Sequence, residues 1–200
     1  MGGKLMTQYV INSVVQIIIF SLLPFAFWYF KSGREEKFLT WIGLKSFKVN
    51  KEIIAMIVVV VLGFTIIDIF ALKLVEGVET ATSVFEGKGV RAVPSILIYA
   101  IFNTALPEEI LFRGFGLKRL KKVVGLNKAN IIQALMFGFL HGLMFFKSLG
   151  FFKALVIISF TGVFAYFMGY INEKKTEGSI LPGVFIHSLA NIFAGLSAAF

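Results

Sequence analysis

The sequence predicts an all-α protein, a polytopic transmembrane helical bundle that forms one integral membrane domain over residues 1–200. Hydrophobic residues make up 58% of the chain and charged residues 16%. Soluble domains are typically about half apolar and about a quarter charged. Helices of about 20 apolar residues span a bilayer, because they satisfy every backbone polar group internally. Six segments of roughly that kind can be recognised, at residues 9–30, 53–75, 94–117, 130–146, 151–171 and 179–200.

The composition also excludes several classes of site and partner. The chain contains no cysteine, which excludes disulfides, thiolate metal ligands and a cysteine nucleophile. The net charge of +9 is typical of many nucleic-acid-binding proteins. Here the basic residues lie in loops between apolar segments, where membrane topology explains them. We therefore expect membrane lipid as a partner and no nucleic acid.

The lysines and arginines predict the orientation of the chain in the cell membrane. Thirteen of them fall in the loops after the first, third and fifth segments, six fall on the opposite side, and Arg113 lies inside a segment. The positive-inside rule then places the three rich loops in the cytoplasm and both termini outside. The longest outer loop, residues 77–93, is interpreted as a plain connection.

Polar side chains lie within three of the apolar segments, and their presence in a membrane requires an explanation. A charged residue at the centre of a membrane helix costs about 2.5–3.5 kcal/mol on insertion scales. The two histidines of the chain are among these residues. The set consists of Glu108, Glu109 and Arg113 in the third segment, His141 in the fourth, and His187 and Asn191 in the sixth.

Helical spacing predicts that these side chains share one site. Glu109 and Arg113 are four residues apart and can pair on one helix face, whereas Glu108 faces elsewhere without a local partner. A rise of about 1.5 Å per residue brings Glu108, His141 and His187 to a similar depth, roughly 15–18 Å from the cytoplasmic side. Pro107 predicts a local kink just before Glu108.

Two kinds of chemistry fit this set. Glu108 and His141 can activate a water molecule, while His187 and Asn191 donate hydrogen bonds to the oxygen that becomes negative as water adds to a carbonyl. This arrangement requires no cofactor. Alternatively, Glu108, His141 and His187 could ligate zinc and leave a position open for water. The residues alone do not distinguish the two.

Three short motifs carry a family resemblance. They are Glu108-Glu109 with Arg113, Phe137 with His141, and His187 with Asn191. In this order on separate helices they resemble the CPBP family, which comprises the CAAX proteases and bacteriocin-processing enzymes and is also called the Abi family. The resemblance covers residues 94–195, the expected catalytic core.

The resemblance implies an intramembrane endopeptidase that cuts membrane-embedded or lipidated peptides. Glu108 would be the main water activator together with His141, and His187 and Asn191 would stabilise the oxyanion. Glu109 and Arg113 would be structural supports. Phe137 is interpreted as a packing residue.

Two other functions are compatible with buried polar residues. One is a non-catalytic membrane scaffold or bacteriocin-immunity partner on the same fold. The other is a proton-coupled transporter, since intramembrane acids and histidines can relay protons. Asp68 in the second segment is a further intramembrane acid. It could line the same cavity, but a hydrogen bond to a neighbouring helix is expected.

Overall fold

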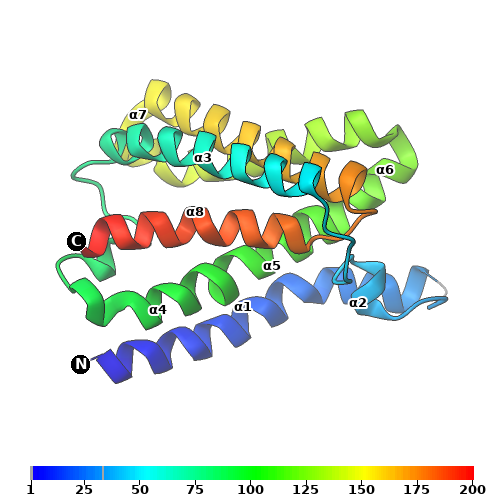
Figure 1. The fold of residues 1–200 in the computed structure, drawn as a ribbon, viewed down its shortest axis with the longest axis horizontal. Coiled ribbons are helices and arrows are strands. Elements are labelled where there is room, and N and C mark those ends of the chain that lie inside the picture. The colour runs from blue at the N-terminus through cyan, green and yellow to red at the C-terminus, as the bar shows by residue number, and fades with distance from the viewer. Residues whose placement is uncertain (1, 33) are drawn as a thin grey trace.

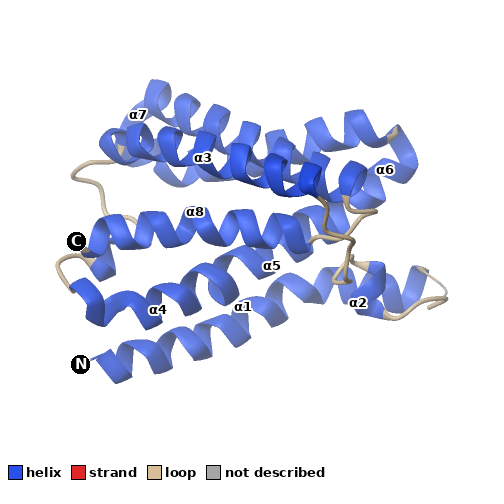
Figure 2. Cartoon of the chain, in the orientation of Figure 1, coloured by secondary structure: helices blue, strands red, loops and turns tan. Residues whose placement is uncertain are grey.

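The fold is a bundle of long helices, seen in a computed structural model that describes residues 2–32 and 34–200 (Figure 1). These residues form helices and connecting loops without any β-strand (Figure 2). The predicted all-α class is therefore confirmed. The helix bounds, in chain order, are α1 Gly2–Lys31, α2 Phe38–Trp41, α3 Lys51–Leu74, α4 Val93–Ile98, α5 Leu106–Glu109, α6 Lys118–Val124, α7 Leu126–Tyr170 and α8 Leu181–Ala199.

Five helical stretches of the described chain are long and apolar enough to cross a membrane. They run over Met6–Lys31, Lys51–Leu74, Gly89–Val124, Leu126–Lys175 and Leu181–Ala199. The third is continuous, because α4, α5 and α6 are joined by wide-turn (π) segments: η3 at Tyr99–Ala105 and η4 at Ile110–Leu117. The fourth combines the segments 130–146 and 151–171, which the sequence predicted as separate spans.

The α7 helix is a hairpin rather than one straight rod. Gly150 has a φ of 76°, a conformation that suits glycine, and it interrupts the helical backbone at that point. The two arms then lie side by side, since the Asn130 amide donates to the carbonyl of Tyr166 at 2.9 Å and the Gln133 amide to that of Ala165 at 3.1 Å. Because the arms are antiparallel, the six predicted apolar segments alternate in direction as expected.

Close approach of the two arms depends on glycine. A Cβ at Gly138 would lie 2.4 Å from the carbonyl oxygen of Ile158 on the opposite arm. Small residues at such positions let membrane helices pack through their backbones. The first arm carries His141, so this packing fixes where that side chain lies.

Pro107 stands within the third stretch, between two π-helical segments. Proline has no backbone N–H and cannot complete a regular helical hydrogen bond. The sequence predicted a kink just before Glu108; the structure has two π-helical segments around this position, since η3 ends at Ala105 and η4 begins at Ile110. Wide turns of this kind re-aim side chains and often occur at functional sites.

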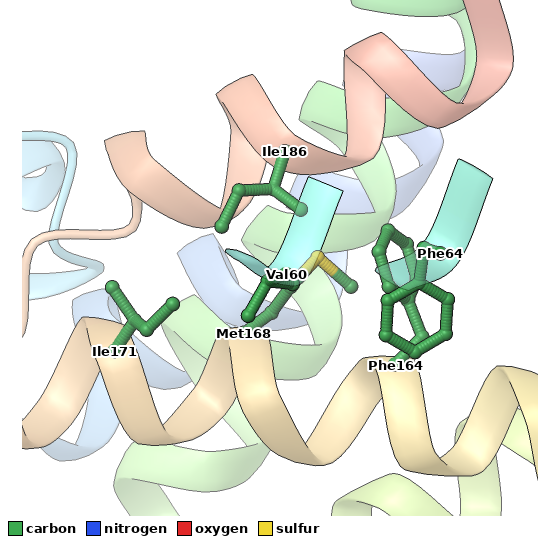
Figure 3. Close-up of a cluster of buried hydrophobic side chains, with 6 residues drawn as sticks. All are labelled: Val60, Phe64, Phe164, Met168, Ile171 and Ile186. Carbon is green, nitrogen blue, oxygen red and sulfur yellow. The ribbon is translucent and has the colours of Figure 1, made fainter. Parts of the chain in front are cut away.

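A buried apolar cluster joins α3, the second arm of α7 and α8 (Figure 3). The Phe64 and Phe164 rings pack with their centroids 4.1 Å apart. Ile186, next to His187 in the chain, is buried in the same cluster. Since lipid is as apolar as these side chains, close packing rather than burial from water holds the helices together. The cluster fixes the face of α8 that presents His187. Its members are Val60, Phe64, Phe164, Met168, Ile171 and Ile186.

The three lysine-rich loops gather at one end of the bundle. Lys118 Nζ lies 2.7 Å from Glu173 Oε1, and the guanidinium of Arg119 stacks over Trp41 at 3.9 Å. Lys175 pairs with Glu52 at the start of α3. Both ends of the chain lie at the opposite end of the bundle (Figure 1). The predicted grouping of the loops is thus present, while the side that faces the cytoplasm stays a prediction.

Candidate active site

One cavity of about 470 Å³ lies between the helices, and all four residues proposed for catalysis line it. Glu108 comes from α5, His141 from the first arm of α7, and His187 and Asn191 from α8. Much of the remaining wall is apolar. It includes Phe20, Leu111, Phe112, Leu140, Met144 and Phe145.

The two adjacent glutamates of α5 have different surroundings. The Glu108 side chain is 22% exposed and faces the cavity, whereas that of Glu109 is 0% exposed. Glu109 Oε1 lies 2.9 Å from Nη1 of Arg113, one helical turn further on. Glu108 Oε2 is buried without a hydrogen-bond partner among the described residues. Glu108 is therefore available to a ligand in the cavity, and Glu109 is held by the protein.

His187 connects the two glutamates. Its Nδ1 lies 3.2 Å from Glu109 Oε1, and its Nε2 lies 3.8 Å from Glu108 Oε2. A carboxylate paired with an arginine accepts hydrogen bonds, so Nδ1 carries a proton. Glu109 thus orients the imidazole and directs Nε2 toward Glu108. This contact joins residues on different helices and could not be derived from the spacing of Glu109 and Arg113.

His141 is oriented by its own helix. Its Nδ1 lies 2.9 Å from the carbonyl oxygen of Phe137, which can only accept a hydrogen bond. Nδ1 is therefore the protonated nitrogen, and in the neutral ring Nε2 has the free lone pair. A lone pair on the wall of the cavity can accept a hydrogen bond from water.

Phe137 does more than fill space. Its ring lies 4.3 Å from the His141 ring and 5.8 Å from the His187 ring, measured between centroids. The guanidinium of Arg113 lies over the same ring at 4.3 Å, a cation–π geometry. The sequence interpretation of Phe137 as packing is thus extended: its ring separates and positions both histidines.

Asn191 is held by a residue that the sequence analysis did not select. Its Nδ2 donates to Oγ1 of Thr104 at 2.7 Å, and the Thr104 hydroxyl in turn donates to the carbonyl of Ala100 at 3.0 Å. One N–H of the Asn191 amide is used in this way, and the second is left for a ligand. Thr104 lies one helical turn before Glu108, and this spacing is the signal that could have identified it.

One other sequence interpretation changes, and one alternative considered for Asp68 does not hold. Residues 77–93 are not only a connection, since Thr80, Ala81 and Thr82 form part of the cavity wall. Asp68 does not line this cavity; it borders a separate small one together with Phe64. Glu108 therefore borders the main cavity, whereas Asp68 borders the small one.

The residues considered for zinc do not form a ligand set. Among the residues that the structure describes, no three histidine, aspartate or glutamate side chains are grouped as metal ligands would be. Nδ1 of each histidine is engaged, with Phe137 for His141 and with Glu109 for His187, which leaves Nε2 of each ring for a ligand in the cavity. We therefore derive no chemical step through a metal.

A family model described as type II CAAX prenyl endopeptidase, Rce1-like, matches residues 90–193, slightly more than half of the chain. This range includes every residue of the three motifs. No curated protein and no solved structure matches the chain.

Proposed function

Because the chain belongs to the Rce1-like family of type II CAAX prenyl endopeptidases, we propose that it is an intramembrane endopeptidase that uses water activated by Glu108 and His141. The observation that carries the proposal is the meeting of Glu108, His141, His187 and Asn191 around one cavity. No serine or cysteine nucleophile is required for this reaction, because water itself attacks the peptide carbonyl.

The first step is removal of a proton from water. The Glu108 carboxylate is the base, since its side chain lines the cavity and is 22% exposed. Nε2 of His141 accepts the second hydrogen of the same water and so aims the oxygen lone pair at the carbonyl carbon. The C–O bond forms as the carbonyl π electrons move to oxygen. General base catalysis of this kind contributes about 10²- to 10⁴-fold to a rate.

The second step is collapse of the tetrahedral intermediate. Nε2 of His187 and the free N–H of Asn191 donate hydrogen bonds to the oxyanion. Since Nδ1 of His187 already donates to Glu109, donation from Nε2 requires the doubly protonated imidazolium, which lies beside the carboxyl groups of both Glu109 and Glu108. The carbon–nitrogen bond then breaks, and Glu108 returns its proton to the leaving amine. The products are a carboxylic acid and an amine, which become a carboxylate and an ammonium ion once the proton of the acid passes to the amine.

The substrate class follows from the cavity walls. The cavity lies within the membrane bundle, and Leu111, Leu140 and Met144 give it apolar sides. Such walls favour apolar side chains or a lipid chain over charged ones. The substrates that fit are hydrophobic, membrane-embedded or lipidated peptides.

The proposal is tested by peptide cleavage. The purified protein is incubated in liposomes with lipidated and hydrophobic peptides, with and without a chelator, and the products are identified by mass spectrometry. Cleavage that persists with the chelator supports direct activation of water. Cleavage that is lost and then restored by zinc would contradict it. A wild-type protein that binds such peptides without cutting any would favour a non-catalytic scaffold.

Thr104 provides a sharper test of the oxyanion contacts. Thr104→Val keeps the shape but removes the acceptor for Asn191, so we expect kcat to fall by roughly 3- to 10-fold with KM nearly unchanged. Thr104→Ser retains the hydroxyl and should restore most of the rate. The measurement is steady-state kinetics on a peptide from the panel. An equal loss in both variants would mean that the threonine matters through packing and not through its hydrogen bond.

A further inference from the structure

Asn172 is fully buried where the second arm of α7 passes into the short π segment η5, Ile171–Lys175. Its backbone is held in place, since its carbonyl accepts hydrogen bonds from the N–H of Gly178 at 2.7 Å and the hydroxyl of Thr176 at 3.1 Å. Its side-chain oxygen accepts from the backbone N–H of Gly183 at 3.0 Å. This N–H lies in the first turn of α8, where helix N–H groups have no partner within the helix. The contact orients the amide, so Nδ2 is the atom left for another partner.

Two unpaired polar atoms lie together over Gly183. Asn172 Nδ2 is a donor and Glu109 Oε2 is an acceptor, and both are buried without a hydrogen-bond partner in the described part of the chain. A Cβ at Gly183 would lie 2.6 Å from each of them, so they are separated by no more than twice that distance. Buried polar groups that stay unpaired cost free energy, and these two complement each other. Because residue 183 has no side chain, the two groups have room to meet.

The carboxylate of Glu109 connects this pair to a histidine of the cavity. Its other oxygen, Oε1, lies 2.9 Å from Nη1 of Arg113 and 3.2 Å from Nδ1 of His187. A carboxylate held at only one oxygen can still turn about its terminal bond, whose torsion has a broad energy minimum. A second contact at Oε2 stops that rotation. The direction in which Oε1 faces His187 therefore depends on what holds Oε2.

We propose that Asn172 is a positioning residue for His187: its amide donates to Glu109 Oε2 and so holds Oε1 against Nδ1 of the imidazole. The partner of one ring nitrogen decides which nitrogen of a neutral histidine carries the proton. With Glu109 held, that proton stays on Nδ1. Without Asn172 the ring has an alternative, because a proton on Nε2 faces the Glu108 carboxylate, 3.8 Å away. Asn172 thus selects one of two tautomers of His187.

NMR of the histidine rings tests this proposal, because the chain has only two histidines. Protein labelled with ¹⁵N histidine is studied in detergent micelles at a pH where both rings are neutral, and the nitrogen shifts identify the protonated nitrogen of each ring. His141 is the internal reference, since its Nδ1 donates to the carbonyl of Phe137 in its own helix. The His141→Gln variant assigns the signals, because it leaves those of His187 alone.

Two variants on different elements disturb the same contact. Asn172→Leu removes the amide, whereas Gly183→Ala keeps every polar group but places a methyl group where the two atoms meet. We expect both variants to move the proton of neutral His187 from Nδ1 to Nε2 in much of the population. We also expect kcat to fall by roughly 3- to 10-fold with KM nearly unchanged. Combining Gly183→Ala with Asn172→Ala relieves the crowding without restoring the donor, so the wild-type signals should not return.

Asn130→Leu is the matched control. Asn130 is also a buried asparagine, but its amide donates to the carbonyl of Tyr166 within the α7 hairpin. This variant should lower thermal stability and leave the proton of His187 on Nδ1. The proposal is overturned if the His187 signals stay unchanged in Gly183→Ala, if Asn130→Leu moves them equally, or if the double variant restores them. The effect on rate rests on the proposed function, whereas the tautomer can be read from a protein that cuts nothing, so the two failures are distinguishable.

Discussion

Replacing Glu108 with glutamine is expected to abolish peptide cleavage while the protein remains folded. Glutamine has nearly the same shape, but its amide cannot take a proton from water. We expect the rate to fall by roughly 10²- to 10⁴-fold, the range for loss of a general base. Product formation is measured by mass spectrometry at equal concentrations of protein, and thermal unfolding in detergent verifies that the variant is folded.

Asp68 offers the matched control for this substitution. It is also an acid within a membrane helix, but it borders a separate small cavity rather than the one that holds Glu108. Asp68→Asn should therefore retain far more of the rate than Glu108→Gln, since Asp68 acts on His187 only through its charge and does not reach the cavity. If Glu108→Gln cleaved peptide as fast as wild type, Glu108 would not be the base. If both variants lost activity equally, a general effect of intramembrane acids on the bundle would explain the loss.

Replacing Arg113 with methionine is expected to destabilise the protein strongly. Arg113 and Glu109 are both 0% exposed and are paired at 2.9 Å, so the substitution removes the permanent cation beside a buried carboxylate. Removal of one partner of a buried ion pair typically costs about 3–5 kcal/mol. The free energy of unfolding is measured by denaturant titration in detergent. Cleavage should fall as well, because Glu109 also orients His187.

Two controls show whether the effect comes from the uncompensated charge. Lys121 pairs with Glu173 at 2.8 Å, but its side chain is 44% exposed. Lys121→Met should therefore cost only about 0–1 kcal/mol, as expected for an exposed pair. Adding Glu109→Gln to Arg113→Met removes the stranded charge and should recover part of the stability. A double variant less stable than Arg113→Met alone would contradict this explanation.

Most of the fold could be predicted from the sequence, because long apolar segments in a membrane must be helical to satisfy their backbone polar groups. The depth of the site within the membrane could also be predicted, since a helix rises by a constant length per residue. The hairpin of α7 was less accessible to prediction. Gly150 turns the chain without any loop of its own, and a single glycine in an apolar run is not a distinctive turn signal.

Contacts within the site were harder to predict where they join residues on different helices. The pairing of Glu109 with Arg113 follows from their spacing, but the contact of Glu109 with His187 depends on how α8 packs against α5. The wall formed by Thr80–Thr82 has no motif, and only the folding of the loop onto the cavity reveals it. Asp68 shows a second limit of prediction from sequence. An acidic residue within a membrane span can be recognised, but the sequence does not indicate which cavity it borders.

The central claim, that this cavity holds the scissile bond of a peptide, is tested most directly by photo-crosslinking. A peptide that the wild-type protein cuts is synthesised with a photoreactive residue next to the scissile bond and is bound to the Glu108→Gln variant, which should retain it uncut. Crosslinks are mapped by mass spectrometry. We expect them on cavity-lining residues such as Leu140, Met144 and Ala194. Crosslinks confined to the lipid-facing groove at Phe139 and Phe151 would contradict the claim.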